Sequence, residues 1–216
     1  MKRRAMMAAG LAGLMAPVMA RAAAGDGDVA VSDAAVLAPI KALDAALITL
    51  MQQASKGVSF KQRYDTLMPV VAKVYDLDLI LSVSVGLLWS QVPAAQQATL
   101  KQVFAAYTVA TYVKSFDHYD GQRFVEQKSV RMLGPRRIVA TQFVPKSGKP
   151  VELDYVMTET NAGWRVSDVL FDGTISKVAT QRSDFSGLVM PGDATKLIAA
   201  LRKKVATLSG GMIKAG

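Results

Sequence analysis

Few side chains in this sequence have the types and spacing that catalysis requires. The chain has one histidine, His118, and no cysteine, which excludes cysteine catalysis, thiolate metal sites and a disulfide framework. His118 falls where a helical pattern should end, a position at which an imidazole interacts favourably with the helix dipole, so we assign it a structural role. The segment 82–86, Ser-Val-Ser-Val-Gly, lacks the leading glycine of a nucleophile elbow. These features favour binding over catalysis.

Two aspartate pairs have the residue types that bind cations. The first pair, Asp26 and Asp28, lies in a stretch of small residues, and the second, Asp76 and Asp78, is expected to begin a helix. Neither pair is followed by an acidic partner at calcium-loop spacing. The sequence has neither a P-loop nor a dinucleotide-binding glycine pattern. We therefore predict no metal site and no cofactor.

One acidic residue keeps an enzymatic alternative open. Asp168 shares strand parity with Val166, so its carboxylate should lie on the buried side unless the strand bulges there. With Tyr155 or Tyr112 it could act on an apolar substrate inside a cone-shaped α+β scaffold, as in steroid isomerases. We favour a structural alternative, in which Asp168 forms a buried ion pair with Arg182 on the apolar stripe of the next helix.

The elements that must position these residues fall into a helical part and a strand part. Residues 32–119 have helical spacing, and Pro69 should kink or divide the second helix. Within 122–171 the period is two, with runs at 123–133, 136–145, 151–160 and 163–171. Short turns force antiparallel neighbours, which predicts a four-stranded meander. Further helices are expected at 176–190 and 193–208, within the C-terminal part 174–208. The fold class is α+β, with helices on one sheet face and the other face wet.

The N-terminus has the pattern of a secretory signal. Basic residues at positions 2–4 precede an uncharged stretch, and Ala20 and Ala22 occupy the small-residue positions that a signal peptidase reads. The stretch is shorter than a spanning helix, although a retained anchor is the alternative. Cleavage after 1–22 would remove four basic residues and lower the net charge from +9 to +5. The mature chain would comprise a flexible leader at 23–31, one domain at 32–208 and a flexible tail at 209–216.

Basic residues cluster at two places. Arg131, Arg136 and Arg137 flank the first hairpin turn, and Lys203 and Lys204 lie on the last helix. We interpret both clusters as solvated surface, with a weak docking surface for anionic lipid or an acidic partner as the alternative. The aromatic residues fall at core periods instead of interleaving with the bases, so we predict no nucleic-acid partner.

The run 163–185 carries the most informative pattern. It reads Gly-Trp-x-Val-x-Asp-Val, then Gly-x-x-Ser, then Arg-x-x-Phe, and in this order it resembles the MlaC-type periplasmic lipid-binding family, also called toluene-tolerance proteins. The upstream motifs at 76–78 (Asp-Leu-Asp) and 86–89 (Gly-Leu-Leu-Trp), with the stretch 104–124, look most like its hopanoid-associated HpnM branch. The similarity extends from about residue 60 to about residue 201.

This resemblance implies an NTF2-like cone with an apolar cavity between sheet and helices. It also implies a soluble, monomeric periplasmic carrier of phospholipid or hopanoid. Its partners would be an inner-membrane ABC-transporter-linked complex and an outer-membrane lipoprotein complex. The apolar side chains expected to line the cavity are Val83, Leu87, Phe104, Val113, Phe116, Tyr155, Met157, Trp164, Val166, Ile175, Val178 and Phe185. Each of them could equally be solid core. A non-lipid adaptor, with its cavity filled by its own side chains, is the third class of function.

Overall fold

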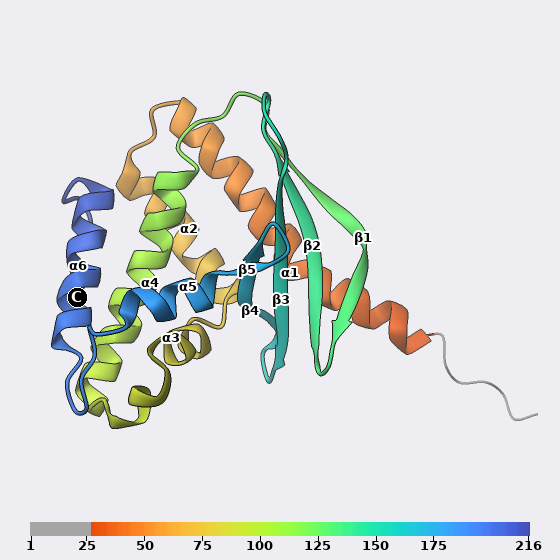
Figure 1. The fold of residues 1–216 in the computed structure, drawn as a ribbon. Helices are drawn as coiled ribbons and strands as arrows, with labels where there is room; N and C mark the ends of the chain where they lie inside the picture. Colours follow the sequence, from red (N-terminus) through yellow and green to blue (C-terminus); the bar gives the residue numbers. More distant parts are fainter. Residues whose placement is uncertain (1–26) are drawn as a thin grey trace, which may run out of the picture.

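The computed structural model describes residues 27–216, except for the side chains of 27–32 and 126–129 (Figure 1). The signal peptide at 1–22 and its cleavage site lie outside the described residues and stay predictions. The helices are α1 (Gly27–Ser55), α2 (Phe60–Val74), α3 (Leu77–Val85), the 3-10 helix η1 (Gly86–Gln91), α4 (Ala94–Ser115), α5 (Lys177–Phe185) and α6 (Thr195–Ser209). The strands are β1 (Arg123–Leu133), β2 (Arg136–Val144), β3 (Val151–Thr160), β4 (Gly163–Phe171) and β5 (Ile175–Ser176).

Side-chain caps fix the starts of α2 and α3. Ser59 and Gln62 form a capping box, in which each side chain accepts a hydrogen bond from the backbone N–H of the other. Asp76 caps α3 by accepting a bond from the Leu79 N–H at 3.0 Å, as the sequence predicts. Pro69 does not divide α2, which continues as one helix to Val74.

The sheet is an antiparallel meander of five strands in the order β1-β2-β3-β4-β5. The predicted count of four is therefore wrong, because the chain turns back after β4 and adds β5, which has only two residues. The reversal passes through Asp172 and Gly173, both with positive φ, and pairs Phe171 with Ile175. Two residues are too few to show a strand period, so this strand leaves no pattern in the sequence.

A β-bulge interrupts the pairing of β3 with β4. Met157 pairs with Val166 whereas the adjacent Val156 pairs with Asp168, so Ser167 is an extra residue on β4. Beyond the bulge, the buried side of β4 changes from even to odd positions, and Val169 is buried there. The parity expected for Asp168 assumed no bulge, so alternation along β4 no longer fixes the side on which its carboxylate lies.

The outer face of the sheet is drier than the expected wet side. Asp154 and Val156 on β3 are both buried, although they alternate with the inward-facing Tyr155. The guanidinium of Arg131, from β1, lies over this face and forms an ion pair with Asp154. A long side chain of one strand thus covers the middle of the sheet.

The helices form a layer against the inner face of the sheet, with α4 packed beside α6 and α2 (Figure 1). Helix α1 crosses the sheet and contacts β1, β2 and β4. Within the described residues, Asp33–Ser55 of α1 is long and apolar enough to cross a membrane by length and composition alone. Its apolar stripe is instead part of the core, with exposures of at most 2% at Val36, Ile40, Leu43, Leu47, Leu50 and Met51.

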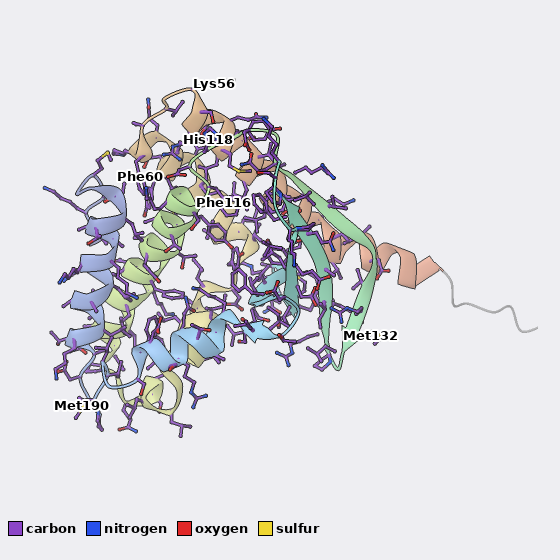
Figure 2. The ribbon with its side chains drawn as sticks, turned by 45° about the horizontal axis from the view of Figure 1, so that its top comes forward. Lys56, Phe60, Phe116, His118, Met132 and Met190 are labelled. Carbon is purple, nitrogen blue, oxygen red and sulfur yellow. The ribbon has the colours of Figure 1, made fainter. Side chains whose placement is uncertain are left out.

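Two exposed side chains lie at opposite ends of the molecule. His118 follows the end of α4 and is exposed, and Met132 lies at the tip of the β1–β2 hairpin at the other end of the molecule (Figure 2).

Residues 209–216, expected to be a flexible tail, return along α6. Ile213 is buried, and Arg202 donates to the Ala215 carbonyl at 3.2 Å.

Candidate functional site

A cavity of about 390 Å³ lies between the inner face of the sheet and helices α3, α4 and α5. Its volume falls in the range of small-molecule sites, roughly 300–1,000 Å³. One wall comes from the C-terminal half of α4, a second from β2, β3 and β4, and a third from α5 and the start of α3. The wall from α4 consists of Phe104, Tyr107, Thr108, Thr111, Tyr112, Ser115 and the adjoining Phe116. The sheet contributes Phe143, Val151, Leu153, Tyr155, Asp168, Val169 and Phe171, and the remaining residues are Tyr75, Leu77, Ile80, Lys177, Val178 and Gln181.

The cavity has a closed apolar end and an open rim. Phe104 and Tyr155, each 1% exposed, lie at the closed end, whereas Ser115, Val151 and Phe171 are exposed at the rim. The opening therefore lies between the C-terminal end of α4 and the paired ends of β3 and β4. An apolar group can enter there and lose contact with water as it moves inward.

Aromatic side chains flank the opening of the cavity near the C-terminus of α4. Phe116 stacks on Tyr112 with ring centroids 6.0 Å apart, and meets Phe143 of β2 edge-on at 5.6 Å. Phe143 contacts Phe124 of β1 at 5.2 Å. These contacts join α4 to the sheet at that end.

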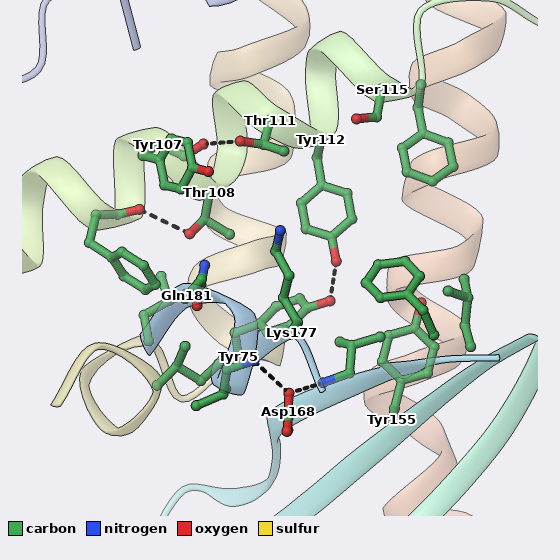
Figure 3. Close-up of a pocket in the computed structure, with 18 of the residues that line it drawn as sticks. Tyr75, Tyr107, Thr108, Thr111, Tyr112, Ser115, Tyr155, Asp168, Lys177 and Gln181 are labelled. Atoms are coloured by element: carbon green, nitrogen blue, oxygen red, sulfur yellow. Dashed lines mark hydrogen bonds between the residues drawn. The ribbon is translucent and has the colours of Figure 1, made fainter. Parts of the chain in front are cut away.

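The buried Tyr75 and Tyr155, with the partly buried Tyr112, place hydroxyl groups in this apolar setting. Tyr75 and Tyr112 are hydrogen-bonded to each other through their hydroxyls (Figure 3). Burial raises the pKa of Tyr112 from 10.0 to about 12 and raises the pKa values of Tyr75 and Tyr155 well above 10.0. The charge of Asp44 on α1 adds to all three upward shifts. The three side chains therefore stay neutral across the physiological pH range.

Asp168 does not form the predicted ion pair with Arg182. Its carboxylate accepts hydrogen bonds from Val169 N at 2.8 Å, Ser176 Oγ at 2.5 Å and Val178 N at 3.0 Å. The bulge at Ser167 turns Asp168 toward the N-terminus of α5, where free N–H groups and the helix dipole favour an anion.

Arg182 lies elsewhere on α5. It is exposed, and its guanidinium lies so close to Gly86 that a Cβ on residue 86 would be only 3.2 Å from Arg182 Nη2. The positive φ of Gly86 and this contact both favour glycine there. With three donors on its oxygens, Asp168 is a structural group, which weakens the enzymatic alternative with Tyr155 or Tyr112.

The structure brings four of the twelve predicted lipid-contacting residues to the cavity, namely Phe104, Phe116, Tyr155 and Val178. Three others are fully buried core that does not line it: Val113, Met157 and Val166. Phe185 is also buried and packs edge-on against Phe104 at 6.3 Å.

The remaining four lie outside the cavity. Leu87 is 87% exposed, Ile175 57% and Val83 43%. Trp164 is half-buried, with the Arg137 guanidinium 5.5 Å from the centre of its ring. Val83 misses the cavity because α3 buries its opposite face, through Ile80, Leu81 and Ser84. Leu87 lies on η1, which has no buried residue.

The sequence reasoning missed the polar lining. Thr108, Thr111 and Ser115 follow Phe104 at spacings of four, seven and eleven, so they share its helix face. That spacing was the available signal. The hydroxyls of Thr108 and Thr111 donate to carbonyls one turn back, at 2.9 and 2.8 Å, so they need no partner in the cavity. Lys177 and Gln181 on α5 were missed as well. Among the described side chains, no cluster is placed to hold a metal ion.

Comparisons with known proteins agree with this architecture. A model of the MlaC protein family matches residues 41–203. A solved structure of a phospholipid-binding protein from Ralstonia solanacearum, in complex with a phospholipid, superposes with a TM-score of 0.69 at 21% identity. The match covers 81% of this chain and 98% of that one. No curated protein matches significantly. The family match spans most of the sequence, and the chain therefore belongs to the MlaC family.

Proposed function

We propose that this protein is a periplasmic carrier that binds a phospholipid non-covalently, with an acyl chain buried in the cavity between α4, α5 and the sheet. The observation that carries the proposal is the cavity of about 390 Å³, apolar at its closed end and open at one rim. Membership of the MlaC family and the phospholipid in the related Ralstonia structure support it. A non-lipid adaptor would need no such space.

The size of the cavity indicates how much lipid it holds. An apolar cavity of about 150 Å³ takes one benzene ring, so by proportion the space here suits roughly 15 carbons. Burying a chain of about 16 carbons removes a hydration cost of about 12 kcal/mol. The cavity thus accommodates one acyl chain in this conformation. A second chain requires α4 to move away from β3 and β4, a change that lipid binding would favour.

The finer parts of the proposal rest on the resemblance to lipid-transfer proteins. The carrier would act as a monomer between an inner-membrane ABC-transporter-linked complex and an outer-membrane lipoprotein complex. Export would follow cleavage of residues 1–22. Hopanoid is the alternative cargo, and the HpnM-like motifs at 76–78 and 86–89 support it.

The test is native mass spectrometry of protein purified from the periplasm without detergent, followed by lipid extraction. We expect near-stoichiometric phospholipid on a chain that begins at Ala23. A Thr111→Trp variant should fill part of the cavity one helical turn inside the rim and reduce lipid occupancy. Thr66→Trp is the matched control, because Thr66 is an exposed helical threonine with the same bond to the carbonyl one turn back. Well-folded wild-type protein that is lipid-free and takes up no phospholipid or hopanoid would refute the proposal.

A further inference from the structure

Lys177 is the one basic side chain among the residues that line the cavity. It lies in the first turn of α5, is half-buried, and extends between that helix and α4 (Figure 3). In the described part of the chain, no carboxylate forms an ion pair with it. Asp168, the acidic residue of the lining, already accepts three hydrogen bonds. An anionic group of a bound ligand would therefore stabilise the half-buried ammonium of Lys177.

Gln181 supplies a second polar group one turn further along α5. It is 6% exposed, and its Oε1 lies 3.3 Å from Ser84 Oγ, which shares its single proton between this oxygen and the closer Ile80 carbonyl at 2.7 Å. This contact orients the amide and leaves its Nε2 without an acceptor among the described residues. Residues four apart on a helix share one face, so the ammonium of Lys177 and the amide of Gln181 face the same space, opposite Thr108 (Figure 3).

Four hydroxyls of the lining are already engaged. The hydroxyls of Thr108 and Thr111 donate to backbone carbonyls, and those of Tyr75 and Tyr112 bond to each other. Lys177 and Gln181 thus provide donors beside an apolar volume. A ligand that suits both has an anionic, oxygen-rich head and an apolar tail.

We infer that Lys177, with Gln181, binds the phosphodiester of the lipid head group and makes the cavity selective for phosphate-bearing lipids over neutral ones. The inference rests on the proposed function, because the acyl chain must occupy the apolar end while the phosphodiester lies near the rim. A charge-assisted hydrogen bond of this kind corresponds to a preference of roughly tenfold to hundredfold.

The experiment offers the protein vesicles that contain equal amounts of phosphatidylglycerol and diacylglycerol with identical acyl chains. The lipid bound after re-isolation is measured by mass spectrometry. The variants are Lys177→Met, which keeps the apolar stem without the charge, Lys177→Gln as a second neutral variant, and Lys177→Arg. Lys196→Met is the matched control, because Lys196 occupies the first turn of α6, is exposed and lies away from the cavity.

We expect wild type, Lys177→Arg and Lys196→Met to prefer phosphatidylglycerol at least tenfold. The two neutral variants should bind the lipids about equally while retaining diacylglycerol and a wild-type unfolding midpoint. A neutral variant that keeps the preference would overturn the inference and leave the carrier function standing. If wild type binds neither lipid, the proposed function itself fails.

Discussion

Replacing Asp168 tests whether its carboxylate joins the β4 bulge to the start of α5. Asp168→Ala removes three hydrogen bonds, two of them from backbone N–H groups of Val169 and Val178. A bond to a charged group contributes about 1.5–3 kcal/mol, but Asp168 is only half-buried, and water can replace part of the loss. We therefore expect the free energy of unfolding to fall by about 3 kcal/mol. Asp168→Asn keeps one oxygen acceptor and should cost less.

Double-mutant cycles measured by urea unfolding distinguish the partner of Asp168. Ser176→Ala combined with Asp168→Ala should show a coupling energy of about 1–2 kcal/mol, because the two side chains are in contact at 2.5 Å. Arg182→Gln combined with Asp168→Ala should be additive within about 0.5 kcal/mol. Coupling to Arg182 above that limit, or additivity with Ser176, would refute the assignment of the carboxylate to the N-terminus of α5.

Three further predictions concern the core and the tyrosines. Arg63→Met should lower the free energy of unfolding by about 2–3 kcal/mol, because the buried guanidinium donates to the carbonyl of Val113 in the last turn of α4. The control Lys61→Met breaks an exposed ion pair and should change the free energy of unfolding by less than about 0.5 kcal/mol. Burial raises the pKa of Tyr112 from 10.0 to about 12, so the unfolded chain loses this proton at a lower pH than the folded protein. The free energy of unfolding should therefore fall as the pH rises from about 10 to about 12. Tyr112→Phe should make this decrease shallower in alkaline denaturation curves. Met157→Asp should abolish folding and lipid binding together, as circular dichroism and lipid extraction would show, because Met157 is fully buried core that does not line the cavity.

The strand boundaries could be predicted from the sequence because two independent signals agree. Alternation of period two marks each run, and turn residues such as those at 134–135 and 161–162 separate the runs. The bulge at Ser167 has no such signal, since no glycine marks it. The parity of Asp168, and with it the ion pair to Arg182, therefore could not be obtained from periodicity.

The cavity residues were harder to predict than the core. A helical stripe shows that a face is buried, but it does not show whether the neighbouring element touches that face or stands away from it. Val113 and Phe116 belong to the same stretch of apolar residues, yet only Phe116 lines the cavity. Lys177 gave no signal because a lone lysine at a helix start is ordinary in a sequence. Its role depends on α5 meeting α4 across an open space.

The contacts that α1 makes in the folded protein affect how the chain folds. This helix is made first, but apart from α2 its main contacts are with β1, β2 and β4, which all follow α4 in the sequence. The part of its apolar stripe that faces the sheet therefore stays uncovered until nearly the whole chain has been synthesised. Contacts between such distant segments form slowly, and exposed apolar surface promotes aggregation in the meantime. We expect the nascent chain to depend on a chaperone that holds α1 until β4 is available.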